Sequence, residues 1–371
     1  MKVNAILKGN GESLRAVRNF LGGLLKEKIV DYLLVPQEIS RGRSYAQTLV
    51  KDPAHLDRAN PFAPVMPMNS GKIVSQLTGD RPTQKVGVVL KPCEIRALIE
   101  LIKLGQAHRE NLVIIGTDCP GTYEVDEYAR MIDEMEGTFE EKERKVLTGM
   151  RKNLEVPGTE SLPVSQRPAC KICHMFTPTL EDINLSLFGV GDGIAVSLED
   201  HLAGKLGLQS GGLSNREEAA GKLLAHRASV REKVFEEFRE KMKNPTGLAD
   251  LLATCIRCYA CSSACPICYC RTCFFRTDTF EPESERYFRW AEREGALRMP
   301  TEILLFHLTR LNHMAASCVD CGMCESACPR RIPLTTLFEA VGDGVKKALN
   351  YTPGKSLEDE IPITTCGQAE A

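Results

Sequence analysis

The sequence predicts an α/β domain followed by a mainly α-helical domain, and three observations support this fold class. Segments with the apolar patterns of strands and helices alternate over residues 86–117, which is typical of a parallel sheet. A long polar stretch with helical periodicity lies near the middle of the chain, and cysteines with a repeated spacing gather in the C-terminal part. We therefore expect an α/β domain at 1–214, a helical connector at 215–245 and a helical domain at 246–371.

The composition is that of a globular protein and excludes several classes. The chain has 371 residues, of which 43% are hydrophobic and 26% charged, enough for two or three compact units. Its formal net charge of -2 does not favour nucleic acid or an anionic membrane as a partner. No apolar run approaches the ~20 residues of a membrane span, and the start MKVNAILKGNGESLR lacks the features of a signal peptide. We expect a cytoplasmic protein, in which thiols stay reduced and the sixteen cysteines are better suited to metal binding than to disulfides.

The first part begins with the periodic segment LRAVRNFLGGLLKEKI, which predicts an amphipathic helix, and DYLLVP, which predicts a short buried strand. After a proline-rich passage, KVGVVLK, CEIRALIELIKL and NLVIIGTDC predict the strand, helix and strand of a parallel βαβ unit. The charged stretch TYEVDEYARMIDEMEGTFEEKERKVLTGMRK is helical in pattern and leads into PACKICHMFTP.

The connector and the third part are predicted to be helical. The segment NREEAAGKLLAHRASVREKVFEEFREKMK has a narrow apolar stripe on an otherwise solvated helix, so we interpret it as the connector. In the third part, SERYFRWAEREG and TEILLFHLTRLNHMAA predict helices between two groups of cysteines.

These two groups share the spacing C-x2-C-x2-C-x3-C-P, which is the bacterial ferredoxin run for 4Fe-4S clusters. The first run is Cys255, Cys258, Cys261 and Cys265, and the second is Cys318, Cys321, Cys324 and Cys328. Two intervening residues let the backbone curl around one cube so that three thiolates reach three irons, while the fourth cysteine of a run normally binds the other cluster. On that rule Cys328 completes the first cube and Cys265 the second. A zinc site is the alternative, but zinc needs only four ligands and no duplicated run.

Three cysteines of the same segment, Cys268, Cys270 and Cys273, have no place in these runs. One interpretation is a fourth cluster that also uses Cys366, and the other is a set of buried thiols, because free cysteine packs as a small hydrophobe. Their spacing matches no described cluster run, so both interpretations stay open.

The first part contains a second constellation of cysteines. Cys93 follows one predicted strand and Cys119 the next, while Cys170 and Cys173 form a C-x2-C pair. The carboxyl ends of neighbouring parallel strands meet at the edge of the sheet where open α/β folds bind ligands. These four thiols form one more 4Fe-4S site or are scattered in the core, where cysteine is often buried.

Four segments of the first part resemble the successive motifs of a known family. GKIVSQLT, LKPCEIRALIEL, NLVIIGTDCPGT and CKICHMFTPTLEDINLSLFGVGDG look like the beta subunit shared by deazaflavin-reducing hydrogenase and deazaflavin-dependent formate dehydrogenase, over roughly Pro61 to Leu198. The cysteine-rich C-terminal module resembles the longer formate dehydrogenase and heterodisulfide-reductase-linked members. The resemblance implies an α/β domain that binds FAD and a 4Fe-4S cluster and exchanges a hydride with the deazaflavin coenzyme.

The resemblance also implies roles for individual residues. The cluster nearest the flavin would be held by Cys93, Cys119, Cys170 and Cys173, and the FAD cradle would contain Asn69, Ser70, Gly71 and Lys72. Small residues before a helix expose backbone N–H groups to a pyrophosphate, and Lys72 adds positive charge. The commoner family forms SGG and TPC are here NSGK and KPC, so a lysine stands beside the expected cofactor in each. Lys91 then binds phosphate, adjusts the flavin or cluster by its charge, or is solvated; Glu94 and Arg96 are further cofactor-binding candidates.

We therefore predict a flavin and iron-sulfur oxidoreductase subunit with FAD and three 4Fe-4S clusters. FAD accepts electron pairs and releases single electrons, which 4Fe-4S clusters carry one at a time. No catalytic nucleophile, acid or base is predicted. The expected partners are a soluble hydride carrier and a formate dehydrogenase, hydrogenase or heterodisulfide-reductase-like subunit in a hetero-oligomer. The alternatives are a flavin-free adaptor between such subunits and a zinc-bearing interaction protein.

Overall fold

The computed structural model describes residues 2–9, 11–209, 211, 215–270, 272–277, 280, 284–295 and 302–362. The chain folds into two compact units. Unit 1 contains the described residues of Met1–Lys233, Val319–Gly322 and Pro353–Asp359. Unit 2 contains those of Val234–Cys318, Met323–Thr352 and Glu360–Ala371.

Unit 1 is built on a mixed seven-stranded sheet with the order β1-β7-β6-β5-β4-β2-β3. Its strands are β1 (Lys2–Leu7), β2 (Tyr32–Ile39), β3 (Ser44–Val50), β4 (Val86–Leu90), β5 (Leu112–Thr117), β6 (Ile183–Ser186) and β7 (Ile194–Glu199). The central strands β2, β4, β5 and β6 are parallel, while β1, β3 and β7 pair antiparallel with their neighbours. The predicted α/β class and its βαβ unit are confirmed, and the antiparallel edges are an addition to the prediction.

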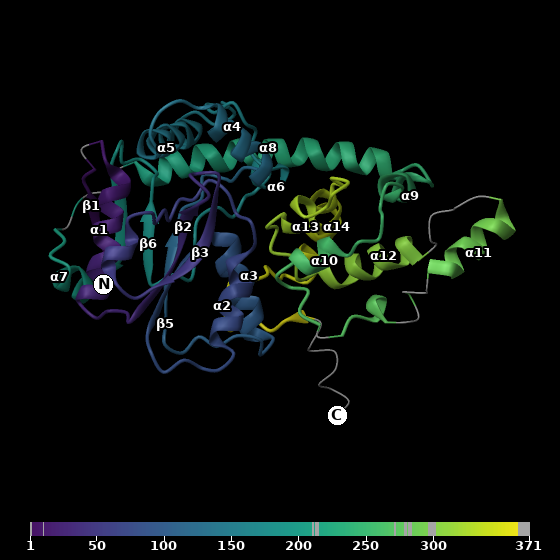
Figure 1. The fold of residues 1–371 in the computed structure, drawn as a ribbon, viewed down its shortest axis with the longest axis horizontal. Coiled ribbons are helices and arrows are strands. Elements are labelled where there is room, and N and C mark those ends of the chain that lie inside the picture. Colours follow the sequence, from purple (N-terminus) through teal and green to yellow (C-terminus); the bar gives the residue numbers. More distant parts are fainter. Residues whose placement is uncertain are drawn as a thin grey trace. The chain divides into compact units, whose positions relative to one another are not determined.

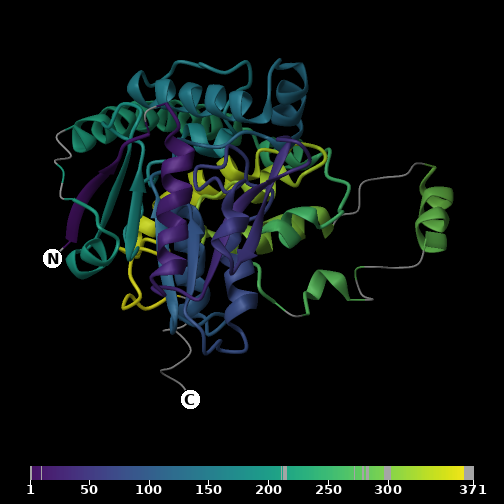
Figure 2. The same ribbon diagram turned by 60° about the vertical axis from the view of Figure 1, so that its left-hand side comes forward.

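The helices of unit 1 pack on both faces of this sheet, and α1 runs alongside the strands in both views (Figures 1 and 2). They are α1 (Ser13–Lys26), η1 (Pro53–Leu56), α2 (Ser70–Thr78), α3 (Pro92–Lys103), α4 (Val125–Glu134), α5 (Phe139–Glu155), α6 (Pro168–Lys171) and α7 (Asp200–Lys205). Side chains of a strand alternate between its two faces. Accordingly Leu33 packs in the core that contains α1, whereas its neighbour Leu34 packs in the core with α2 and α3. The two faces therefore have separate hydrophobic cores.

The charged stretch that the sequence predicts as helical is two helices, α4 and α5. The chain breaks at Gly137, whose φ of +113° lies in the region that favours glycine. Thr138 then caps α5, because its hydroxyl accepts the N–H of Glu141 at 3.3 Å and the Glu141 carboxylate accepts the N–H of Thr138 at 2.9 Å.

Unit 2 is helical, as predicted. Its elements are α9 (Gly247–Leu252), α10 (Ala260–Ala264), η2 (Phe274–Arg276), α11 (Ser284–Glu294), α12 (Glu302–Ala315), α13 (Met323–Ser326) and α14 (Leu334–Ala348); helix α8 (Arg216–Met242) begins in unit 1 and ends here. Helix α12 packs on α14, and α10 packs on α13. Phe306 of α12 lies between two rings, with centroids 5.0 Å from Tyr259 and 5.2 Å from Phe275. In the part of the chain that the structure describes, no helix has the length and apolar character of a membrane span.

Candidate functional site

The four cysteines of the first part lie around one cavity in unit 1. Cys93 occupies the first turn of α3, directly after β4, and Cys119 follows the parallel neighbour β5. Cys170 lies in the short helix α6, and Cys173 comes just after it. All four line a cavity of about 30 Å³. The sheet edge therefore brings them together as the strand pattern predicts, while their role as cluster ligands stays a prediction.

Three buried cations line the same cavity, namely Lys91, Arg167 and Arg227. Their exposed fractions are 6%, 2% and 2%. Arg227 donates to the carbonyl oxygen of Pro120 at 2.8 Å and stacks on Phe176 at 5.1 Å. Buried charges are costly unless they are compensated by opposite charge. A group of thiolates and iron with net negative charge supplies that compensation, so the lining of the cavity fits a 4Fe-4S cluster.

The thiols themselves are poor acids without such compensation. Burial and then the neighbouring thiol of Cys321 raise the pKa of Cys93 well above its ordinary range. Burial raises the pKa of Cys173 to about 12, although the Arg227 guanidinium acts in the opposite direction. Burial also raises the pKa of Cys119, against the charges of Lys91 and Arg227. Because a metal deprotonates the thiols that bind it, iron would supply what the protein environment does not.

A fifth thiol, that of Cys321, lines this cavity as well, which the sequence did not predict. Its segment Val319–Gly322 belongs to unit 1. Arg96 holds the segment by donating to the carbonyl oxygen of Val319 at 3.0 Å, and Arg167 donates to the carbonyl oxygen of Cys321 at 2.9 Å. Arg96 also donates to the carbonyl oxygen of Pro353 at 2.9 Å, so in this structure it joins distant segments of the chain. Local spacing contains no signal for such a contact across more than 200 residues of sequence.

A polar chain links Cys321 to Cys170 within unit 1. The N–H of Thr122 donates to Cys170 Sγ at 3.4 Å, and the Thr122 hydroxyl lies 3.3 Å from the same sulfur. Arg167 Nη1 donates to that hydroxyl at 3.2 Å, while its Nη2 donates to Cys321. Hydrogen bonds to sulfur are among the features that set the potential of an iron-sulfur cluster.

The residues that the family resemblance assigns to the FAD cradle bond mainly to one another. The Asn69 side chain accepts the N–H of Gly71 at 3.0 Å, and the N–H of Lys72 donates to the Asn69 carbonyl at 3.2 Å. Glu94 accepts the N–H of Ser70 at 3.0 Å and the N–H of Lys91 at 2.8 Å. One buried carboxylate thus caps the first turns of both α2 and α3. The N–H groups of the expected cradle are therefore already satisfied, and they do not fit a pyrophosphate in this structure.

Gly71 has a packing role in the same place. A Cβ atom at this position would lie 2.7 Å from the carbonyl oxygen of Glu94 and 3.0 Å from the backbone nitrogen of Leu98. Both atoms belong to α3, so the glycine allows α2 and α3 to approach closely.

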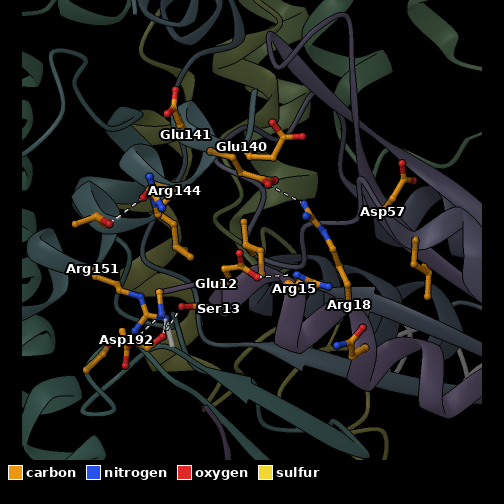
Figure 3. Close-up of a pocket in the computed structure, with 18 of the residues that line it drawn as sticks. Glu12, Ser13, Arg15, Arg18, Asp57, Glu140, Glu141, Arg144, Arg151 and Asp192 are labelled. Atoms are coloured by element: carbon orange, nitrogen blue, oxygen red, sulfur yellow. Dashed lines mark hydrogen bonds and ion pairs between the residues drawn. The ribbon is translucent and has the colours of Figure 1, made fainter. Parts of the chain in front are cut away.

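A larger cavity of about 790 Å³ lies elsewhere in unit 1, between α1, α5 and the turn before β7 (Figure 3). Its volume is in the range of small-molecule pockets. Two of its arginines form ion pairs, Arg18 with Glu143 at 2.7 Å and Arg15 with Glu12 at 3.1 Å, while Arg151 donates to backbone carbonyls that include Gly193 at 2.7 Å. The lining among the described residues has no cysteine. This cavity therefore has the size of a cofactor site but lacks thiol ligands for an iron-sulfur cluster.

In unit 2, four ferredoxin-run thiols line one cavity of about 20 Å³. They are Cys255, Cys258, Cys261 and Cys328. This is the set in which the fourth cysteine of the second run joins the first three of the first run. His307 Nε2 lies 3.4 Å from Cys255 Sγ, and the N–H of Arg257 donates to the same sulfur at 3.4 Å. Burial raises the pKa of Cys261 to about 11.

The two runs repeat their backbone conformation as well as their spacing. In the first run Arg257 and Tyr259 have φ of 56° and 57°. The equivalent positions of the second run, Asp320 and Gly322, have φ of 58° and 70°. Left-handed residues are uncommon outside glycine, so four at matched positions indicate two loops curled in the same way. Each loop leads into a short helix, α10 or α13.

The remaining cysteines do not form a described site. Cys268 and Cys273 are half-buried, Cys270 is exposed, and Cys366 lies outside the described residues. Burial, and then the thiol of Cys265, raise the pKa of Cys268. Within the described residues no three His, Cys, Asp or Glu side chains converge closely enough to hold one metal ion. A fourth cluster stays a prediction.

Comparisons with known proteins match both units. Residues 83–198 match the family of the C-terminal region of the coenzyme F420 hydrogenase/dehydrogenase beta subunit, and residues 251–332 match the 4Fe-4S dicluster domain family. These matches confirm the family resemblance and the ferredoxin module that the motifs predict.

Three relatives have similar sequences. The F420-dependent formate dehydrogenase subunit beta of Methanocaldococcus jannaschii is 26% identical over 97% of this chain and 96% of its own length. The F420-dependent formate dehydrogenase 1 subunit beta of Methanococcus maripaludis is 28% identical over 75% of this chain and 74% of its own length. The coenzyme F420 hydrogenase subunit beta of Methanococcus voltae is 23% identical over 46% of this chain and 64% of its own length.

Proposed function

We propose that this chain is the iron-sulfur electron-transfer subunit of a multi-subunit oxidoreductase of the formate dehydrogenase or hydrogenase type, because residues 83–198 match the coenzyme F420 hydrogenase/dehydrogenase beta-subunit family and residues 251–332 match the 4Fe-4S dicluster domain family. The observation that supports this proposal most strongly is the arrangement of thiols. Two separate sets of thiols each line a small cavity, five in unit 1 with Cys321 among them and four in unit 2, and neither set is contiguous in sequence.

Three cubes are proposed, and each would be held by thiolates. Unit 1 would hold one with Cys93, Cys119, Cys170 and Cys173; unit 2 would hold one with Cys255, Cys258, Cys261 and Cys328; the remaining run cysteines Cys265, Cys318, Cys321 and Cys324 would hold the third. A bound 4Fe-4S cube accepts and releases single electrons.

Other side chains of this chain would set the charge and the hydrogen bonds around the clusters. Lys91 and Arg227 offset negative charge beside Cys119, and Arg227 also does so beside Cys173. Thr122 donates to Cys170. His307, whose pKa is lowered to about 4 by burial and by Arg310, is neutral at pH 7 and adds no charge beside Cys255.

The source of the electrons depends on FAD and on the deazaflavin coenzyme. The relatives are named for dependence on coenzyme F420, which favours a two-electron carrier as a reaction partner. In this chain the cradle groups at 69–72 are bonded to one another and to Glu94, so we assign no step to FAD there. The flavin-free adaptor is the second candidate function. Release of FAD on denaturation of the anaerobically purified protein would favour the flavoprotein, and its absence would favour the adaptor.

We further propose that the chain works in a hetero-oligomer with a catalytic formate dehydrogenase or hydrogenase subunit, or with heterodisulfide-reductase-like subunits. Clusters that transfer electrons need other redox centres nearby as donors and acceptors. Size-exclusion chromatography of native material should show a complex larger than one chain. A solitary monomer with full physiological turnover would contradict this part of the proposal.

The test of electron transfer is reduction of the anaerobic chain. With dithionite, low-temperature electron paramagnetic resonance should show reduced 4Fe-4S signals, and reduced deazaflavin or formate with the catalytic subunit should produce the same signals. A chain that contains zinc and gives no such signal would overturn the proposal.

A further inference from the structure

Arg310 is a buried cation of unit 2 that belongs to no sequence motif. It lies on α12 with an exposed fraction of 5%. Its guanidinium is packed between two rings, 5.7 Å from the centroid of Phe306 and 5.0 Å from that of Phe338. Nη2 donates to the carbonyl oxygen of Cys261 at 3.3 Å. The buried Nε and Nη1 have no hydrogen-bond partner among the described residues.

Such an arrangement is unusual for arginine. A guanidinium has five N–H donors, and each buried donor that stays unpaired carries a desolvation penalty of about 1–3 kcal/mol or more. No carboxylate pairs with Arg310 in the ion pairs of the described residues. A group that accepts hydrogen bonds and has negative charge would therefore complete this site.

The thiols around Arg310 come from both ferredoxin runs. Cys261 accepts from it through its carbonyl, and Cys265 Sγ lies 3.7 Å from Met314 Sδ, one turn further along α12. Helices α10 and α13 are packed together, which places Cys324 near these two. A guanidinium is always protonated in proteins. Arg310 therefore places a fixed positive charge among cysteines of both runs.

We propose that Arg310 is a positioning residue shared by the two 4Fe-4S cubes of the ferredoxin runs, to whose sulfur atoms its free N–H groups donate. This inference rests on the proposed function, in which Cys261 belongs to one cube while Cys265 and Cys324 belong to the other. Each cube gains one negative charge when it takes up an electron. A fixed positive charge in a low-dielectric interior favours the reduced form, and hydrogen bonds to sulfur raise the potential in the same direction. Because Arg310 lies beside thiols of both cubes, it raises both potentials.

The test is a redox titration of the whole protein, followed by electron paramagnetic resonance, on wild type and three variants. Arg310→Gln removes the charge and keeps much of the volume. Arg310→Lys keeps the charge. Lys347→Gln is the matched control, because Lys347 lies on α14, which packs on α12, and its side chain is exposed to solvent, which screens its charge.

In Arg310→Gln we expect the signals of both ferredoxin-run cubes to move to more negative midpoint potentials. At a fixed potential the ratio of reduced to oxidised cube should fall on the order of tenfold, which is ~59 mV for a one-electron couple. Arg310→Lys should lie closer to wild type, and Lys347→Gln should match it. The inference is wrong if Arg310→Gln keeps both potentials, or if only one cube shifts.

Iron content separates the possible failures. If Arg310→Gln loses iron, the Arg310→Lys variant distinguishes the two roles. If Arg310→Lys keeps both cubes near their wild-type potentials, the charge of residue 310 is what matters. If both variants lose iron equally, Arg310 has only a packing role and the inference is wrong. A wild-type protein without the two ferredoxin-run cubes would instead overturn the proposed function on which the inference rests.

Discussion

Lys91 places a buried positive charge at the cavity of unit 1. It follows β4, is 6% exposed and lines the cavity with the four thiols. Lys91→Met should therefore move the potential of the unit 1 cube to more negative values, because the reduced cube loses a buried positive neighbour. Lys85→Met is the control, since Lys85 precedes the same strand and is exposed. Equal potentials in the two variants, measured by redox titration, would show that Lys91 has no electrostatic role.

Glu143 predicts a pH dependence of stability in unit 1. Burial raises the pKa of Glu143, although the Arg18 guanidinium at 2.7 Å acts in the opposite direction. A carboxyl with a raised pKa binds its proton more tightly in the folded state. Its contribution to stability is therefore fully present below the ordinary glutamate pKa of about 4.3 and is lost as the pH rises through the folded value.

Glutamine cannot ionise, so the Glu143→Gln variant does not lose this contribution to stability as the pH rises. We expect the free energy of unfolding of Glu143→Gln, relative to wild type, to rise as the pH increases from about 4.3. Urea denaturation at a series of pH values measures this difference. A relative stability that falls with increasing pH would be the contrary result.

At the scale of elements, the contact between α2 and α3 depends on a glycine. Gly71→Ala would place a methyl group 2.7 Å from the Glu94 carbonyl oxygen, so the helices must separate. We expect a loss of about 1–3 kcal/mol in the free energy of unfolding. Gly79→Ala, at the other end of α2, meets atoms only at 3.5 Å and beyond and should stay within about 0.5 kcal/mol of wild type. Thermal unfolding without flavin compares the two, and equal stability would show that the helix contact tolerates a side chain.

The two ferredoxin runs predict a crossed pattern of cluster loss. Cys328 lines the cavity with Cys255, Cys258 and Cys261, so Cys328→Ser and Cys258→Ser should damage the same cube. Serine replaces a soft thiolate with a hard, poorly ionised hydroxyl. Cys270→Ser is the control, because Cys270 is exposed and outside both runs. Electron paramagnetic resonance of the reduced variants reports which signal is lost. Loss of different signals in Cys328→Ser and Cys258→Ser would contradict the crossing.

Elements with strong periodicity could be predicted from the sequence. The segments for α1, α3, β4 and β5 have long apolar stripes or runs, and the structure forms them at those places. Strands β1, β3, β6 and β7 were not predicted; β1 and β7, for example, stabilise each other by pairing although they lie far apart in the sequence. The first turn of α2 also differs from expectation: the family resemblance implied a phosphate site there, but the N–H of Ser70 donates to Glu94 of another helix and the N–H of Gly71 to the Asn69 side chain. A tertiary contact of this kind is invisible in local sequence.

At the scale of the whole molecule, the cysteine spacing predicted the groups of thiols but not the buried charges around them. Two identical runs predicted a shared module because cluster geometry dictates their spacing. Arg310 and Arg227, by contrast, lie on helices with no motif, and only the fold shows them buried beside thiols. Cys321 likewise lines the unit 1 cavity although its run belongs to the ferredoxin module. The charges that would adjust the clusters are therefore a property of the tertiary structure.

The central claim is that this chain holds three 4Fe-4S cubes, one of them at the sheet edge of unit 1. The most direct measurement is iron and acid-labile sulfide per chain in the anaerobically purified wild type and in Cys93→Ser. We expect about 12 irons with matching sulfide in wild type and about 4 fewer in the variant, with the signals of the two ferredoxin-run cubes retained. Stoichiometric zinc with little iron, or a Cys93→Ser protein that keeps every iron, would contradict the account.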